Sequence, residues 1–469
     1  MTYTSFSFYV FLVIALVAYY VIPKAYRWLA ILLANFCFVW FASESISKLV
    51  FFAGTIVVSY LFGLLLEKRK NKTWLFAGIL ISACPLLIDR LLGFIEGKVP
   101  ENIVSSIVIP LGLSFYTMQI IAYLVDIYRG KIKPQNNFFK YALFISFFPQ
   151  IIQGPIPRYD MLSDQLIEGH AFNEKDFLRG IQLIIWGFFL KFMIADKAGV
   201  VVNTIFDDYN SYKGLYIWIA GILYSLQLYT DFLGCVTLSQ GIAQLFGINL
   251  MDNFKHPYFS DSIKDFWRRW HISLSSWLRD YIYIPLGGNR KGTYRKNINL
   301  LVTFAVSGLW HGGGIKFIFW GLMHGVYQLI EGLVPILQKK YEGAKRFLRI
   351  LVNFYFVMIA WIVFRADDLK AGLKMIYRMF KGFNPWIFFD GAIYDLGLVQ
   401  REWEVLILSI LVLFWVSRKQ EAGIVIRERF EQRALPVRWF IYILAIVVIW
   451  VFGTYGFGYD ATDFIYGGF

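Results

Sequence analysis

The stretch from residue 265 to 325 decides the fold. It begins with DFWRRWHISLSSWLRD at residues 265–280, continues through PLGGNR at 285–290, and ends with SGLWHGGG at 307–314 and GLMHG at 321–325. Three of the five histidines of the chain lie here. Elsewhere the long segments are apolar, so titratable groups, glycines and tryptophans gather in this one place. We therefore look here first for a functional site.

The composition is that of a membrane protein. The chain is 58% hydrophobic and only 17% charged, whereas a soluble protein is about half apolar and roughly a quarter charged. Apolar runs near the ~20 residues that cross a bilayer recur along the whole length. The sequence therefore predicts an all-α, polytopic membrane protein with no separate soluble domain.

The basic surplus fits a membrane surface. The chain has 46 Lys and Arg against 32 Asp and Glu, a net charge of +14. The bases lie between apolar runs, where they anchor cytoplasmic loops to anionic lipid, so we predict membrane lipid and no nucleic acid as partner. The three cysteines are far apart, and no histidine spacing resembles a zinc motif, so we predict no disulfide and no metal site.

The apolar runs give the candidate spans. The first lacks a charged leader and a cleavage site, so we expect it to be retained. The run at 215–246 is longer than a span needs, and we predict a break at residues 231–234. The candidate spans are residues 5–21, 29–41, 49–66, 74–88, 103–127, 177–201, 215–246, 298–310, 315–330, 347–364, 405–416 and 439–457.

The loop charges give the orientation. Lysines and arginines cluster after the first, third and fifth spans, at residues 24–27, 68–72 and 129–140. Since basic loops stay in the cytoplasm, the N-terminus is predicted outside, as are residues 366–404 and the tail at 464–469. The basic stretch at 255–296 is then cytoplasmic.

An apolar segment at residues 138–157 contains Pro149, Gly154, Pro155 and Pro157. Proline removes a helical hydrogen bond and clashes with the preceding turn, so a straight helix is excluded. Non-helical backbone at membrane depth survives only inside protein or beside a wet cavity. We predict a re-entrant or interrupted segment beside an interior cavity.

Residues 261–280 have apolar side chains at helical spacing and bases on the other faces, which predicts one amphipathic helix that lies at the membrane interface or is partly sunk into the protein. A basic helix that only adheres to lipid is the simpler alternative. Acidic Asp265 and Asp280 and a histidine at 271 interrupt the bases. Lipid adhesion does not require them, so we also consider this segment functional.

Two histidines fall at apolar runs. His311 ends one run and is followed by three glycines. Because glycine has no side chain, a ligand or a backbone segment can approach the ring closely. It is either a reacting group or a histidine that hydrogen-bonds between helices. His324 is interpreted as a packed, hydrogen-bonded core residue. His170 and His256 are expected to be solvated.

A resemblance to a known family follows from several motifs together. They are FWRRWHISLS through WLRDY at 266–281, PLGGNR at 285–290, GLWHG at 308–312, FFPQ with GPI at 147–156, DNF with PY at 252–258, FRA at 364–366 and FIY at 464–466. This combination resembles the membrane-bound O-acyltransferase (MBOAT) family, in particular its bacterial AlgI-like branch of alginate O-acetylation. The first 130 residues match only as hydrophobic helices. DFLGCVTLS at 231–239 and Gly467-Gly468 depart from the usual pattern of that branch, which leaves the acceptor open.

The resemblance implies a fold and a reaction. The fold would be a single MBOAT-type domain over residues 1–469, with about 11–13 helices, some re-entrant or interfacial, around a central cavity. Residues 1–130 would form N-terminal helices, 138–365 the catalytic core and 366–469 the C-terminal helices. The reaction would be acyl transfer to a hydroxyl, with His311 as general base and His271 as a second catalytic position.

The resemblance also implies substrates. Acetyl-CoA would be the donor substrate, with no tightly bound cofactor. The residues expected to bind the donor are Arg268, Arg269, Arg279, Asn289 and Arg290, with Lys291 beside them. Those expected to line the cavity are Trp270, Trp277, Trp310 and His324.

The acceptor would be a cell-envelope polysaccharide outside a bacterial cytoplasmic (inner) membrane, served by an extracytoplasmic SGNH-type partner protein. Three alternatives stay open. D-alanyl transfer to teichoic acid, as in DltB-like relatives, would use an aminoacyl carrier protein as donor. A transporter of polysaccharide precursors would show inverted repeats, and the sequence has none. A structural scaffold would tolerate replacement of His311 and His271.

Overall fold

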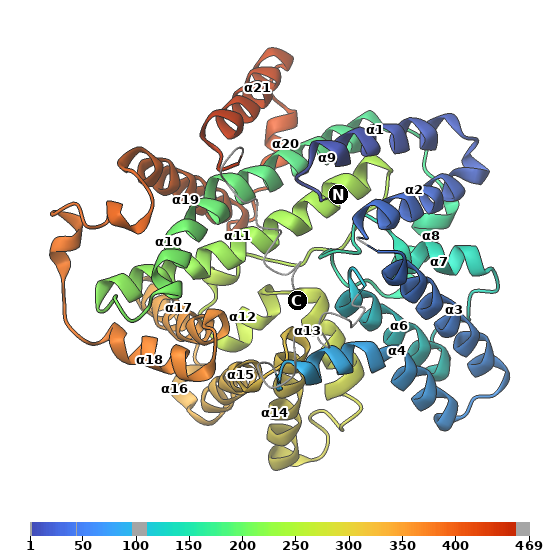
Figure 1. The fold of residues 1–469 in the computed structure, drawn as a ribbon, viewed down its shortest axis with the longest axis horizontal. Helices are drawn as coiled ribbons and strands as arrows, with labels where there is room; N and C mark the ends of the chain where they lie inside the picture. The colour runs from blue at the N-terminus through green and yellow to red at the C-terminus, as the bar shows by residue number, and fades with distance from the viewer. Residues whose placement is uncertain (1, 44, 96–109, 456–469) are drawn as a thin grey trace.

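The computed structural model describes residues 2–43, 45–95 and 110–455 (Figure 1). Within these ranges the chain is helical and contains no β-strand. Its main helices, in chain order, are α1 (Phe6–Val21), α2 (Arg27–Ala42), α3 (Ile46–Lys68), α4 (Lys72–Leu92), α6 (Leu113–Arg129), α7 (Phe138–Ser146), α8 (Tyr159–Glu168), α9 (Glu174–Phe188), α10 (Asp196–Asp207), α11 (Leu215–Leu245), α12 (Ile263–Arg269), α13 (Ile272–Leu278), α14 (Gly292–His311), α15 (Ile315–Leu333), α16 (Pro335–Gln338), α17 (Gly343–Arg365), α18 (Leu369–Met379), α19 (Gln400–Glu421), α20 (Ile426–Glu431) and α21 (Leu435–Phe452).

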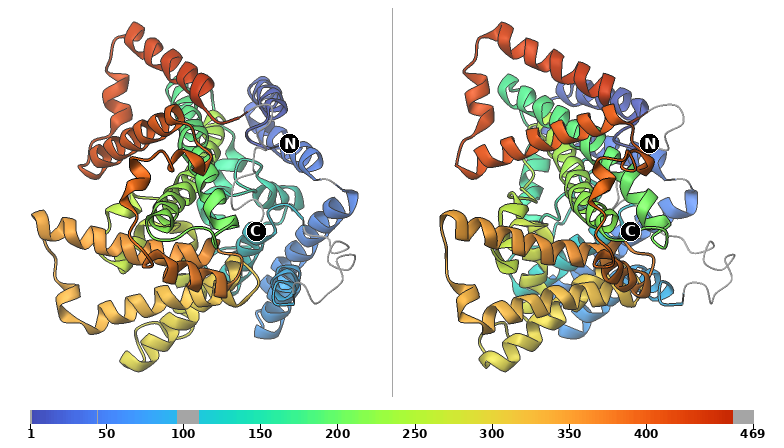
Figure 2. Two further views of the ribbon diagram at one scale, coloured as in Figure 1. Left: turned by 60° about the vertical axis from the view of Figure 1, so that its left-hand side comes forward. Right: turned by 90° about the vertical axis from the view of Figure 1, so that its left-hand side faces the viewer.

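Helix α11 is the central element. It packs along α9, along α10 and against α17, while α1–α4 lie on one side of it (Figure 1). Figure 2 shows α20 and α21 projecting from the body, and no residue of α21 is buried. Seven helical segments of the described chain are long and apolar enough to cross a membrane: Lys24–Ala42, Ile46–Lys68, Lys72–Leu92, Glu174–Asp207, Leu215–Leu245, Gly343–Arg365 and Leu435–Phe452. The chain is therefore an all-α, multi-pass membrane protein, as its composition predicted.

Most predicted spans correspond to helices. The first four coincide with α1–α4, and the runs at 298–310 and 315–330 form the hairpin of α14 and α15. Of the run at 103–127, residues 103–109 lie outside the described residues, and so do residues 456–457 of the last run and the tail at 464–469. Helix α18 and several shorter helices were not predicted, because they are amphipathic or too short to form an apolar run.

The predicted break in α11 is wrong, since the helix runs unbroken for 31 residues. Its buried carboxylate, Asp231, lies 2.8 Å from Lys191 Nζ, which also lies 2.9 Å from Asp196 Oδ1. An ion pair compensates the charge, so the helix does not have to open to reach water. A helix of this length is about 46 Å long, and tilt accommodates it in a bilayer.

The irregularity lies instead in the neighbouring helix. Between α9 and α10 the chain forms a π-helical turn, Phe189–Ala195, and Lys191 is part of it. A π-turn inserts an extra residue and re-aims the side chains that follow. Here both Lys191 and Asp196 reach the same small cluster against α11.

The interrupted segment at 138–157 is present. Helix α7 ends at Ser146, and residues 147–158 are non-helical and almost entirely buried. Asn35 of α2 satisfies this backbone: its side chain donates to the carbonyl of Leu143 and accepts from the amide of Phe148. Irregular backbone is thus held inside protein, as physical reasoning requires.

The single helix predicted at 261–280 is wrong. Helices α12 and α13 are separated at Trp270 and His271, and His271 has a positive φ of 43°. Asn253 causes the break, because its carbonyl accepts from Ile272 and its side-chain oxygen accepts from the amide of Ser273. These bonds replace those of a continuous helix and start α13 afresh.

Candidate active site

The hairpin of α14 and α15 positions the candidate base. His311 is the last residue of α14. A Cβ on Gly308 would lie 2.1 Å from the carbonyl oxygen of Phe317, and a Cβ on Gly321 would lie 2.1 Å from that of Phe304. Only glycine allows the two helices to come so close. This close contact fixes the end of α14 and hence the position of His311.

His311 is buried, with 2% of its surface exposed. Its ring centroid lies 4.8 Å from Trp310, 5.1 Å from Trp320 and 5.5 Å from Phe364. These aromatic groups come from α14, α15 and α17. The imidazole is therefore buried among aromatic rings at the meeting point of three helices.

Two tryptophans connect the three histidines of the stretch. The indole of Trp310 lies 5.8 Å from the ring of His271 and 4.8 Å from that of His311. Trp320 in turn lies 5.1 Å from both His311 and His324. All three histidines are buried. The fold thus brings into one cluster residues that are up to 53 positions apart.

His271 presents an available ring nitrogen. Its Nδ1 lies 3.4 Å from Asn253 Oδ1, and its Nε2 has no hydrogen-bond partner among the described residues. Because the amide oxygen only accepts, Nδ1 carries the proton and Nε2 has a free lone pair. Burial lowers the pKa of His271 to about 3, so the ring is neutral at physiological pH.

His324 is packed as predicted, but the hydrogen bonds expected for it are not found within the described part of the chain. Its ring lies 5.1 Å from Trp267, and neither ring nitrogen has a partner among the described residues. The two histidines expected to be solvated are half-buried, and the ring of His170 donates to the carbonyl of Gln165.

Sequence reasoning missed Arg90, a buried residue of α4. Its Nε donates to the carbonyl of Trp310 at 3.0 Å, its Nη2 donates to Ser114 Oγ at 2.8 Å, and it pairs with Asp89. The last carbonyls of a helix lack partners and attract cations. Arg90 therefore caps α14 beside His311. The charged pair that follows the apolar run at 74–88 was the available signal.

Some of the residues predicted to bind the donor already have an ion-pair or hydrogen-bond partner among the residues that the structure describes, and others do not. Arg269 is held by Asp265 and Glu421, each at 2.8 Å, and Arg279 pairs with Asp280. Asn289 accepts a hydrogen bond from Tyr283. Arg268, Arg290 and Lys291 are exposed and have no ion-pair partner in the described chain.

The tryptophans predicted to line a cavity are buried in packing contacts. Trp277 Nε1 donates to the carbonyl of Met118 at 2.9 Å, Trp310 Nε1 donates to that of Ser114, and Trp270 packs against Trp361. A cavity of about 610 Å³ lies between α15, α16 and α17, and neither these tryptophans nor His324 line it.

Fold and site define a class of protein: a multi-pass helical membrane protein with a buried histidine at a glycine-packed helix hairpin. The model of the membrane-bound O-acyltransferase family, MBOAT, matches residues 132–366. The chain belongs to this family, as its motifs predicted, and it is an O-acyltransferase.

The chain is similar in sequence to three proteins of named activity. The chain is 34% identical to the "Probable alginate O-acetylase AlgI" of Pseudomonas aeruginosa, over 88% of this chain and 80% of the relative. It is 32% identical to the peptidoglycan O-acetyltransferase of Helicobacter pylori, over 72% of this chain and 71% of the relative. It is 29% identical to the teichoic acid D-alanyltransferase of Bacillus subtilis, over 64% of this chain and 79% of the relative.

Proposed function

We propose that the protein moves acetyl groups from cytoplasmic acetyl-CoA across the membrane for O-acetylation of an extracytoplasmic cell-envelope polysaccharide, with His311 as general base. Two of the three relatives are named for O-acetylation, of alginate and of peptidoglycan, and in both the match covers more than two thirds of their length. The observation that carries the proposal is the position of His311 within the segment matched by the family, buried at the end of α14.

The chemistry requires a base at this point. The hydroxyl of the first acetyl acceptor has a pKa far above 7, so its proton must leave as its oxygen attacks the thioester carbonyl. His311 would accept that proton, the new C–O bond would form and the C–S bond would break. The imidazolium would then return the proton to the departing thiolate. Because aromatic rings surround the imidazole, water is excluded and hydrolysis of the acyl group is suppressed.

His271 would orient the attacking group. Its neutral ring accepts through Nε2, while the side chain of Asn253 holds Nδ1–H. A neighbouring donor group of the acceptor, donating to Nε2, would be held against Trp310, whose indole also contacts His311, so the attacking hydroxyl keeps its proton for His311. This division gives one histidine to proton transfer and the other to positioning.

The donor would be attracted from the cytoplasm by the exposed cations Arg268, Arg290 and Lys291, whose charges are not engaged in ion pairs within the described chain. Arg269 and Arg279 are paired already and would contribute less.

We place the protein in the bacterial cytoplasmic membrane with its N-terminus outside. An extracytoplasmic SGNH-type protein would then receive the acetyl group and pass it to the polysaccharide.

Mass spectrometry of envelope polysaccharides tests this function. Cells that lack the protein should lose ester-linked acetyl groups, and the chemical context of those groups would identify the acceptor. An unchanged acetyl content would contradict the proposal. Loss of D-alanyl esters from teichoic acid would instead assign the chain to the activity named for its Bacillus subtilis relative.

A further inference from the structure

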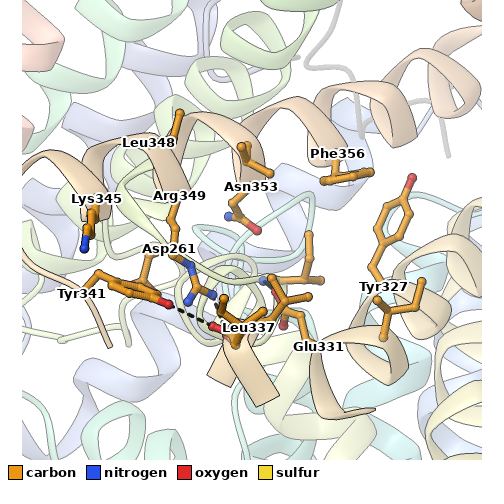
Figure 3. Close-up of a pocket in the computed structure, with 14 residues that line it drawn as sticks. Asp261, Tyr327, Glu331, Leu337, Tyr341, Lys345, Leu348, Arg349, Asn353 and Phe356 are labelled. Carbon is orange, nitrogen blue, oxygen red and sulfur yellow. Dashed lines mark hydrogen bonds between the residues drawn. The ribbon is translucent and has the colours of Figure 1, made fainter. Parts of the chain in front are cut away.

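A second site lies away from the histidines, between α15, α16 and α17 (Figure 3). This cavity has a volume of about 610 Å³. It is lined by Asp261, Ile263, Tyr327, Ile330, Glu331, Ile336, Leu337, Tyr341, Lys345, Leu348, Arg349, Val352, Asn353 and Phe356. Neither His311 nor any residue in ring contact with it is part of this lining.

The cavity has an apolar wall that is open to its surroundings. The side chains of Ile330, Ile336, Leu348, Val352 and Phe356 are 42–61% exposed. Helix α17, which supplies three of them, is long and apolar enough to cross a membrane. Exposed apolar side chains on such a helix face lipid tails. The wall therefore suits a hydrocarbon chain that enters sideways from the bilayer.

The cavity also has a charged end, and its four charged residues divide into two kinds. Arg349 donates to the carbonyls of Leu337 and Lys339, and the carboxylate of Glu331 accepts from the amides of Ile263 and Lys264. These two charges are used by the protein itself.

Lys345 and Asp261, by contrast, have no ion-pair or hydrogen-bond partner for their charged groups in the described part of the chain. Lys345 precedes Val352 by seven residues, about 10 Å along α17. Among its described residues, the cavity thus offers one free cation and one free carboxylate at one end and an apolar wall farther along.

Asn353 adds an acceptor without a donor. It is only 7% exposed, and its Nδ2 donates to the carbonyl of Ser260 and to Ser260 Oγ. Asn353 lines the cavity, and its Oδ1 is buried and has no hydrogen-bond partner among the described residues. Buried carbonyl oxygens are normally paired, so the occupant of the cavity should bring a hydrogen-bond donor. A hydrocarbon or a simple phosphate ester dianion would bring none.

We propose that this cavity binds a glycerophospholipid whose headgroup ends in a primary ammonium, as in phosphatidylethanolamine. One acyl chain lies along Leu348, Val352 and Phe356. The phosphate pairs with Lys345 and the ammonium with Asp261, while Asn353 Oδ1 offers a further acceptor to the donors of the headgroup. The charges thus match a zwitterion, and the apolar wall matches its chain.

Native mass spectrometry of the full-length protein in detergent tests the proposal directly. The probes are phosphatidylethanolamine, phosphatidylglycerol and phosphatidylcholine with identical acyl chains. Wild type should retain phosphatidylethanolamine at least tenfold more than either other lipid. Equal retention of the three would overturn the headgroup assignment, because only the first has a primary ammonium.

Variants locate the site. Val352→Trp should fill the cavity and abolish retention, whereas Leu351→Trp should not, since Leu351 is equally exposed at 48% but does not line the cavity. Asp261→Asn should remove the preference for phosphatidylethanolamine over phosphatidylglycerol. Lys345→Gln should weaken retention of both phosphatidylethanolamine and phosphatidylglycerol. The control Lys72→Gln replaces an exposed lysine at the start of α4 and should weaken retention of neither lipid. Undiminished retention by Val352→Trp, with an unchanged melting temperature, would refute the site.

Discussion

The guanidinium of Arg90 donates a 3.0 Å hydrogen bond to the backbone carbonyl of Trp310, the residue before His311. The two residues belong to different helices and are 220 positions apart in sequence. Arg90 also lies outside residues 132–366, the part of the chain matched by the family model. The N-terminal helices are thus part of the site and not merely its surroundings.

Arg90→Met should destabilise the protein and reduce acetylation. The substitution leaves the Trp310 carbonyl and the Asp89 carboxylate without their cation, which costs about 1.5–3 kcal/mol for a bond to a charged group. Thermal unfolding in detergent and polysaccharide acetylation in cells measure the two effects. Arg69→Met, at an exposed arginine after α3, is the control and should change neither. Full activity of Arg90→Met would show that capping α14 is dispensable.

The glycine contacts of the hairpin predict a contrast within one helix. Gly321→Ala would place a methyl group 2.1 Å from the carbonyl oxygen of Phe304, and such overpacking costs about 1–3 kcal/mol. Gly332, also in α15, has no neighbouring atom within 4 Å of the position that an alanine methyl group would occupy. Gly332→Ala should therefore be neutral or stabilising by about 0.5–1 kcal/mol. Equal melting temperatures for the two variants would contradict the close packing.

The buried ion pairs of Lys191 predict that replacing this lysine greatly lowers the stability of the protein. Lys191→Met leaves two buried carboxylates, Asp196 and Asp231, without the shared cation. Removing one member of a buried ion pair destabilises by about 3–5 kcal/mol. The variant should unfold at a much lower temperature or fail to accumulate in the membrane. Lys191→Met with Asp231→Asn should recover part of the loss, and a double variant no better than the single one would argue against the pairing.

The burial of His271 predicts a pH dependence of stability. Its pKa is about 3 in the folded protein and about 6.5 in an unfolded chain. The unfolded chain binds the proton more readily, so this stabilising contribution is complete above about pH 6.5 and is lost as the pH falls toward 3. Between pH 7.5 and 5, the melting temperature of wild type should fall more than that of His271→Asn. Parallel decreases would indicate that the ring is not buried as a neutral group.

Much of the fold was predictable, because apolar runs of spanning length are a local property of the sequence. The continuity of α11 was not, since it depends on a lysine 40 positions away that compensates Asp231. The break at His271 was also hidden. Apolar spacing continues across it, and its cause is Asn253 in a preceding loop.

The site was predictable in part for the same reason. The three histidines lie in one unusual stretch, and the fold does cluster them. The bonding of the arginines could not be predicted, because Arg269 is engaged by Glu421, 152 positions away. Arg90 was hidden because its partner, the carbonyl of Trp310, carries no signal in the sequence.

The central claim is that His311 takes the proton from the acceptor hydroxyl, and one comparison tests it most directly. Ester-linked acetate on envelope polysaccharide is measured in cells that express wild type, His311→Ala or His170→Ala at equal abundance in the membrane. His170, in the connection before α9, lies outside the histidine cluster. His311→Ala should lower acetylation by about 10²–10⁴-fold, the usual contribution of general base catalysis, and His170→Ala should leave it unchanged. Acetylation by His311→Ala at the wild-type level would contradict the assignment.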